Sequence, residues 1–171
     1  YHRPVRKERI VLFIDIVGST DMAERLGPEK GMDLLIRFIF DACAIIRRHG
    51  GDILNYTGDG LVVLWPAKQA SEALESVQAL RKHTRESGDY YRNKFNEVPD
   101  FRAGIHAGTI VIGQIGEEKL FLGLSGDTVN TAARLEKMHK ETGTNILISK
   151  AGADALPAAQ QSQLQSLGQK E

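Results

Sequence analysis

The chain has 171 residues, of which 42% are hydrophobic and 26% charged, so length and composition fit one globular domain with a hydrophobic core. Its 22 basic and 22 acidic residues cancel, which argues against nucleic acid or a membrane surface as a partner. The single cysteine, Cys43, excludes an internal disulfide, and no apolar run approaches the roughly 18 residues of a spanning helix. We expect a cytoplasmic domain.

The first half of the chain alternates predicted strands with predicted helices. Ile, Val and Phe predict a buried strand over residues 9–16, and a short helix is expected over residues 19–27. Apolar residues at three-to-four spacing predict a long amphipathic helix over residues 28–49. Residues 52–66 contain a Gly-Asp-Gly turn between two apolar runs, which predicts a hairpin.

The second half continues the same mixture. A helix is predicted over residues 69–85, a loop over 86–100, another hairpin over 101–116, a helix over 127–141 and a strand over 145–149. Two hairpins between helices exclude a doubly wound parallel sheet. The pattern predicts an α+β sandwich, with helices on one face of a mainly antiparallel sheet.

Two carboxylates are placed where an apolar strand would end. Asp15 closes the first strand and Asp59 lies in the turn of the first hairpin. If these strands are neighbours, the two like charges meet at one sheet edge, where a cation such as Mg²⁺ would relieve their repulsion. The alternatives stay open at this point: Asp15 could cap the following helix, and Asp59 could be an ordinary turn residue.

The residues after Asp15 favour an anion site. Val17, Gly18, Ser19 and Thr20 lead from strand to helix, so backbone N–H groups and a helix N-terminus are presented together. That arrangement binds phosphates.

The helix predicted over residues 127–141 has a polar and an apolar stripe. Asn130 and Arg134 are four residues apart and share one face, while Ala132 and Ala133 indicate close approach to a neighbouring element. By itself such a polar stripe is typical of a solvated face.

Four motifs in this order resemble the class III nucleotidyl cyclases, the adenylate and guanylate cyclase catalytic domains. The resemblance runs from about Ile10 to Ser149 and rests on "FIDIVGST", "GGDILNYTGDGLVVLW", "FRAGIHAGTIVIGQIG" and "GDTVNTAARLE". It implies a ferredoxin-like βαββαβ core with helices packed on the sheet.

The resemblance also implies a mechanism. Asp15 and Asp59, with the backbone carbonyl of Ile16, would hold two Mg²⁺ or Mn²⁺ ions beside a nucleoside triphosphate. Asn130 would position the ribose, and Arg134 would stabilise charge on the α-phosphate during formation of a 3′,5′-cyclic nucleotide. In the family the metal aspartates of one subunit face the Asn and Arg of the other, which implies a homodimer.

Two positions depart from the family pattern. The purine-selecting positions hold Asn55 and Gly123, where adenylate cyclases usually carry Lys and Asp or Thr, and guanylate cyclases usually carry Glu and Cys. ATP is our expected substrate over GTP. A guanylate or dual-specificity cyclase, and a non-catalytic nucleotide-binding dimerisation module, remain the alternatives.

The ends of the chain carry expectations of their own. Residues 1–9 are basic and are expected to link an upstream regulatory or sensor region to a catalytic domain over residues 10–171. The family's phosphate-binding lysine is not assigned to Lys170, because the C-terminal strand that would carry it is expected to be truncated.

Three further features are interpreted as structural. His106 is expected to be a satisfied core or interface histidine, and Cys43 a core residue of the long helix. The aromatic residues Tyr90, Tyr91 and Phe95 are expected to anchor the predicted loop over residues 86–100.

Overall fold

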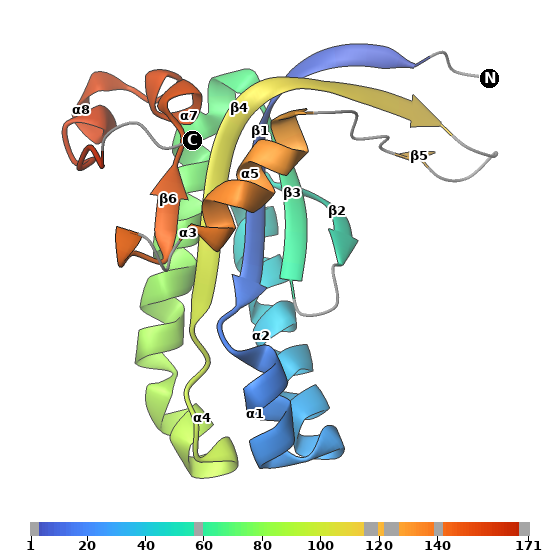
Figure 1. The fold of residues 1–171 in the computed structure, drawn as a ribbon, viewed down its shortest axis with the longest axis vertical. Helices are drawn as coiled ribbons and strands as arrows, with labels where there is room; N and C mark the ends of the chain where they lie inside the picture. Colours follow the sequence, from blue (N-terminus) through green and yellow to red (C-terminus); the bar gives the residue numbers. More distant parts are fainter. Residues whose placement is uncertain (1–3, 57–59, 115–119, 122–126, 139–141, 168–171) are drawn as a thin grey trace.

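A computed structural model describes residues 4–56, 60–114, 120–121, 127–138 and 142–167 (Figure 1). Its strands are β1 (Val5–Ile16), β2 (Asp52–Tyr56), β3 (Gly60–Pro66), β4 (Phe101–Gln114), β5 (Leu120–Phe121) and β6 (Ile146–Ile148). Its helices are α1 (Ser19–Leu26), α2 (Pro28–Arg48), α3 (Ala70–Glu86), α4 (Gly88–Phe95), α5 (Asp127–Lys137), α7 (Lys150–Asp154) and α8 (Ala158–Gln161), with a 3₁₀ turn at Ala67–Gln69.

The described strands form a sheet in the order β2-β3-β1-β4-β5, and β6 also pairs with β4. β1 lies between β3 and β4 and pairs antiparallel with both, whereas β6 runs parallel to β4. The α+β class with a mainly antiparallel sheet, as predicted, is confirmed.

Side chains of β1 alternate between the two faces of this sheet, as a strand requires. Ile10, Leu12 and Ile14 are fully buried in the large core with α2 and α3. Val11 belongs instead to a smaller cluster that contains Ala132 of α5.

Helices therefore lie on both faces. In Figure 1, α5 lies in front of β4 and β1, and α2 and α3 lie behind the sheet. The prediction that the helices occupy one face is wrong for α5, because a single chain's strand periodicity does not say which face a later helix covers.

The predicted hairpin over residues 101–116 is one continuous strand, β4. It pairs with β1 from Phe101 opposite Ile16 to Ile112 opposite Val5. Gly104 and Gly108 are ladder positions of this strand. The structural role of Gly108 is close packing, because an added Cβ would lie 2.6 Å from Thr128 Oγ1.

The predicted loop over residues 86–100 contains helix α4. Tyr91 and Phe95, one helical turn apart, are 1% and 2% exposed and belong to the large core. Their i,i+4 spacing is the helical signal that the polar residues around them obscured. Burial raises the pKa of Tyr91 to about 12.

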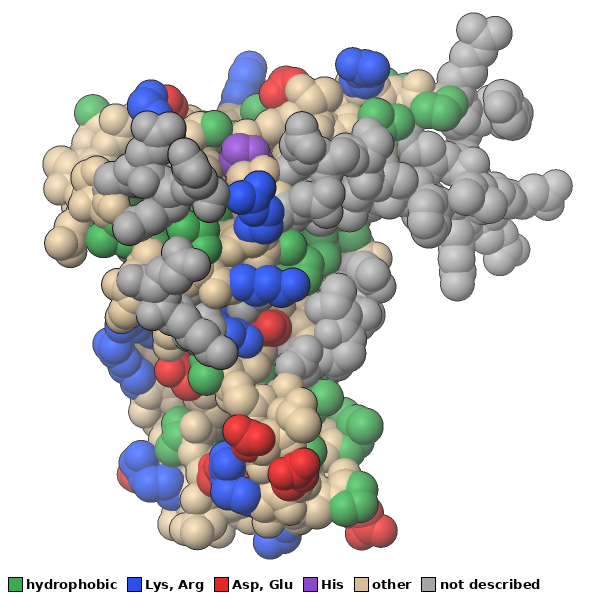
Figure 2. Space-filling view, viewed as in Figure 1, with side chains coloured by type: hydrophobic (Ala, Val, Ile, Leu, Met, Phe, Trp, Pro, Cys, Tyr) green, Lys and Arg blue, Asp and Glu red, His purple; other side chains and the backbone are tan. Residues whose placement is uncertain are grey.

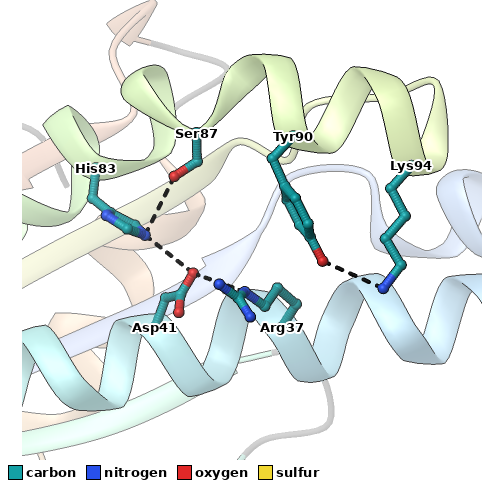
Figure 3. A network of polar contacts seen from close by, with 6 residues as sticks. All are labelled: Arg37, Asp41, His83, Ser87, Tyr90 and Lys94. Atoms are coloured by element: carbon teal, nitrogen blue, oxygen red, sulfur yellow. Dashed lines mark hydrogen bonds and ion pairs between the residues drawn. The ribbon is translucent and has the colours of Figure 1, made fainter.

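α2 is tied to both α3 and α4 by polar contacts. Asp41 of α2 accepts from His83 Nε2 of α3 at 3.1 Å (Figure 3). Lys94 of α4 lies 3.3 Å from Asp33 of α2. These contacts fix one side of α2 against its neighbours.

The start of β1 and the end of α5 differ from the predicted boundaries. β1 begins at Val5, so residues 5–9 extend the sheet, and the strand predicted over 9–16 is longer than expected. The helix predicted to reach residue 141 ends at Lys137. Among the described residues, no helix has the length and hydrophobicity to cross a membrane.

Candidate active site at the end of the central strand

Asp15 lies near the last position of β1, on the face that carries α5. Its strand neighbours in register are Gly60 of β3 and Arg102 of β4. Ile14 and Ile16, on either side of it, point into the large core and are 0% and 1% exposed. The Asp15 side chain is 18% exposed, so a carboxylate stands at the margin of an otherwise apolar strand.

Arg102 neutralises this carboxylate through two hydrogen bonds. Its Nε donates to Asp15 Oδ1 at 3.2 Å, and its Nη2 donates to Oδ2 at 3.3 Å. A guanidinium matches a carboxylate in this two-pronged geometry, and both side chains are 18% exposed. Arg102 was not singled out from the sequence. The signal was available, because Arg102 is a charge within an apolar strand, as Asp15 is.

The turn after Asp15 leads into α1 through a left-handed residue. Gly18 has φ 63° and ψ 34°, a conformation that side chains with a Cβ rarely adopt. Val17 N–H donates to Asp100 O at 2.9 Å, which fixes the turn against the segment before β4. As the N-cap of α1, Gly18 has no side chain to accept from the first turn of the helix, which begins with Ser19 and Thr20.

α5 packs closely on this face of the sheet. Thr128 Oγ1 donates to Thr109 O of β4 at 2.7 Å, and Ala132 is fully buried, as its small size predicted. Arg134, two residues on, is exposed. Figure 2 shows Lys and Arg side chains following one another down the face that α5 covers.

Several predicted site residues fall outside what the structure describes. Asp59 and Gly123 lie outside the described residues, although Gly60, the neighbour of Asp59 in the chain, is paired with Asp15. For Asn55 and Asn130 only the backbone is described, in β2 and α5 respectively.

The described part of the site fits a divalent cation in its chemistry. Mg²⁺ prefers oxygen ligands such as carboxylates. The ion is usually bound by one or two carboxylates and keeps several of its water molecules. Asp15 supplies one such group, and the described residues hold no cluster of three or more His, Cys, Asp or Glu. Asp15 thus offers one carboxylate at this edge of the sheet, and its role as a metal ligand stays a prediction.

His106 lies on the same face, opposite Val11 of β1 and four ladder pairs from Asp15 and Arg102. Its Nδ1 lies 2.6 Å from Ser149 Oγ, and that oxygen also accepts from Gly152 N–H at 3.1 Å. The hydroxyl proton is thus free to point to Nδ1, which fits a neutral ring. Burial lowers the pKa of His106. His106 has a polar partner, as expected of a structural histidine, and Cys43 is 6% exposed in the core.

The chain also matches known proteins. A family model described as adenylate and guanylate cyclase catalytic domain matches residues 4–171. Adenylate cyclase 2 of Rhizobium meliloti (strain 1021) is 36% identical over 152 residues, which are 87% of this chain and 42% of that protein. The chain thus spans less than half the length of this curated relative.

Two solved structures are similar in fold and sequence. The adenylyl cyclase CyaB from P. aeruginosa superposes with a TM-score of 0.79 at 29% identity, covering 90% of this chain and 82% of that one. The guanylyl cyclase Cya2 gives a TM-score of 0.79 at 27% identity, covering 90% and 80%. One of these two structures is thus named an adenylyl cyclase and the other a guanylyl cyclase.

Proposed function

This chain belongs to the adenylate and guanylate cyclase catalytic domain family, and from that premise we propose that it converts ATP to 3′,5′-cyclic AMP and pyrophosphate. The observation that carries the proposal is the half-buried carboxylate of Asp15. It stands at the end of the central strand, beside a glycine turn and on the face of the sheet that α5 covers.

Asp15, the carbonyl of Ile16 and Asp59 would hold the divalent cations, two Mg²⁺ or Mn²⁺ in each site. Bound there, such ions lower the pKa of a hydroxyl and neutralise phosphate charge. The turn Val17–Thr20 would receive the phosphates at the N-terminus of α1, where backbone N–H groups favour anions.

The α5 residues act on the sugar and the reacting phosphorus. Asn130 would hold the ribose, so that its 3′-oxygen lies in line with the α-phosphorus. The bond from that oxygen to phosphorus forms, the bond from phosphorus to the bridging oxygen breaks, and pyrophosphate leaves while the hydroxyl proton passes to solvent. Arg134, exposed on α5, would neutralise charge on the α-phosphate oxygens.

We further propose that each site is shared by two chains of a homodimer. Asp15 of one chain would face Arg134 of the other, and the exposed position of Arg134 supports a role toward a second molecule. The shorter span relative to the Rhizobium protein supports a catalytic domain that acts as the intracellular signalling output of a longer, regulated protein. Because β1 begins at Val5, the domain includes residues 5–9, which were expected to be part of a linker.

Base preference rests on Asn55 and Gly123. An amide donates and accepts hydrogen bonds, so Asn55 does not choose sharply between purines, and Gly123 has no side chain. This composition favours a dual-specificity cyclase as the second candidate. Replacing Asn55 by Lys should raise the ratio of ATP to GTP turnover if the residue faces the base, and an unchanged ratio would remove it from the purine site.

The test is product formation by the purified chain with Mn²⁺ and either ATP or GTP. We expect cyclic AMP from the wild type, and activity reduced at least about 100-fold in Asp15→Ala and Arg134→Ala. Lys137→Ala, which removes another exposed base from α5, is the matched control and should retain activity. Nucleotide binding without any cyclic product would favour the non-catalytic module, and cyclic GMP alone would overturn the adenylate assignment.

A further inference from the structure

One side of α2 exposes large apolar residues to solvent. Met32, Ile36 and Phe40 are 56%, 58% and 68% exposed and follow one another at intervals of four residues. That spacing puts them on one line along the helix. Single exposed apolar residues are ordinary, whereas a continuous line of them is typical of an interaction surface.

An open groove of about 530 Å³ runs along the same side. It is lined by residues of α2 from Met32 to Arg47, including the partly buried Leu35 and Ile39 and the buried Cys43. The exposed line is therefore the rim of an apolar surface that continues toward the core.

The other sides of α2 are already occupied. Leu34 and Phe38 are buried in the large core. The polar side faces α3 and α4 (Figure 3), where Asp41 contacts His83 and Arg37 Cζ lies 5.2 Å from the centre of the Tyr90 ring. The apolar side alone faces away from both contacts.

Opposite charges stand at the two ends of this apolar line. Glu29 precedes Ile36 by seven residues and Arg47 follows Phe40 by seven, so all four share one stripe. Both charged residues are exposed. The stripe is symmetric about the height of Phe38, with an acid on one end and a base on the other at equal distances of about 13 Å along the axis.

We propose that a second copy of this chain docks on this face, with the two α2 helices antiparallel about a two-fold axis at the height of Phe38. In that register Ile36 of each copy meets Phe40 of the other, and Met32 meets the small Ala44. Glu29 comes level with Arg47, which forms two ion pairs at the rim.

A second copy of the chain, related by a two-fold axis, is the partner that matches the equal spacing of Glu29 and Arg47 about Phe38. Such an interface pairs one surface patch with itself, so it must be self-complementary in shape and charge. An unrelated partner needs no equal spacing of acid and base about a midpoint. α2 and α5 lie on opposite faces of the sheet, so this association and a shared catalytic site use different surfaces, and a chain using both forms assemblies larger than dimers.

Sedimentation velocity over a range of chain concentrations tests the association. Phe40→Glu should weaken it at least about 100-fold, because a charge enters the apolar centre of the interface. Val98→Glu places the same charge on an apolar residue that is 38% exposed elsewhere, and it should leave association unchanged. The proposal is contradicted if Phe40→Glu associates as strongly as the wild type. It is also contradicted if the wild type forms no assembly larger than the dimer shared through α5.

A charge exchange tests the orientation. Arg47→Glu alone and Glu29→Arg alone should each weaken association about tenfold, because like charges then meet twice across the axis. The double variant should return to the wild-type value, since the ion pairs are restored with reversed sign. Additive loss in the double variant would contradict the antiparallel register.

A disulfide tests the register directly in a Cys43→Ala background. Met32→Cys with Ala44→Cys should give a covalent dimer on mild oxidation, because the two positions are about 18 Å apart within one helix and can bond only between chains. Met32→Cys with Arg48→Cys is the control, because Arg48 lies about 6 Å further along the helix axis than Ala44, the residue that meets Met32 in this register. Equal cross-linking in both pairs would contradict the proposed register. Circular dichroism and thermal unfolding of every variant separate lost association from lost folding.

Discussion

The two faces of the central sheet differ in what they contribute. On the face covered by α2 and α3, Ile10, Leu12 and Ile14 of β1 are all fully buried. On the α5 face, the alternate residues change from the buried Val11, through Phe13, to the charged Asp15. One strand thus stabilises the fold with one set of side chains, and the other set includes the candidate site residue Asp15, where the second apolar cluster ends.

Matched leucine truncations should separate the two faces most clearly. Leu12→Ala, in the large core, should lower the free energy of unfolding by about 3–4 kcal/mol, because the cavity is enclosed on all sides. Leu64→Ala, in the smaller α5 cluster, should cost about 2 kcal/mol. Urea unfolding measures both, and equal losses would contradict the contrast between the faces.

Gly108→Ala tests how closely α5 approaches β4. Its Cβ would lie 2.6 Å from Thr128 Oγ1 and 2.9 Å from Cγ2, so the Thr128 side chain or α5 must shift. We expect a loss of about 2–3 kcal/mol in stability together with reduced cyclase activity. Thr128→Ala removes both nearest atoms, so the double variant should be less destabilised than the sum of the single variants. If the losses of stability of the two single variants add up exactly in the double variant, the contact between residues 108 and 128 does not limit how closely α5 approaches β4.

The ion pair of Asp15 and Arg102 tests the charged end of the α5 face. Arg102→Ala leaves a carboxylate that is 18% exposed without this counter-charge, and stability should fall by about 1–2 kcal/mol. Adding Mn²⁺ should recover part of that loss, because the cation replaces the guanidinium charge. In an Asp15→Ala background, Arg102→Ala should neither lower stability nor make stability depend on Mn²⁺. Stabilisation by Mn²⁺ that persists in this background would show that the cation binds away from Asp15.

The smallest effect is expected at His106, on the same face. Because burial lowers its pKa, the folded state prefers the neutral ring. The free energy of unfolding is therefore unaffected by His106 above the unfolded pKa of about 6.5. As pH falls below that value the unfolded chain takes up the proton more readily, so stability decreases. His106→Gln should reduce the change in stability between pH 7.5 and pH 5, measured by urea unfolding. An identical pH dependence in the variant would exclude His106 as a source.

The sequence was sufficient where a periodic signal was strong. The long apolar period of α2, the two strands at residues 52–66 and the small Ala132 all led to correct predictions. The hairpin prediction over residues 101–116 was wrong because a glycine-rich strand resembles a turn in sequence, whereas Gly104 and Gly108 are ladder positions of β4.

The site shows the same division. Asp15 was identified because a lone carboxylate in an apolar strand demands a partner. Arg102 carries the same signal of a charge within an apolar strand. Its pairing with Asp15 could not be predicted, because the strand register that brings together two residues 87 positions apart is a long-range property. Tyr91 and Phe95 were assigned to a loop because the polar residues around them obscured their i,i+4 spacing, and their burial in the core is a tertiary property.

Mixing two inactive variants tests the central claim most directly. Asp15→Ala and Arg134→Ala chains should each be inactive as homodimers, and equal mixing should restore about a quarter of wild-type specific activity, because half of the dimers then carry one intact site out of two. That recovery is the predicted result. Activity that stays at the level of the separate variants after subunit exchange would contradict a site built from Asp15 of one chain and Arg134 of another.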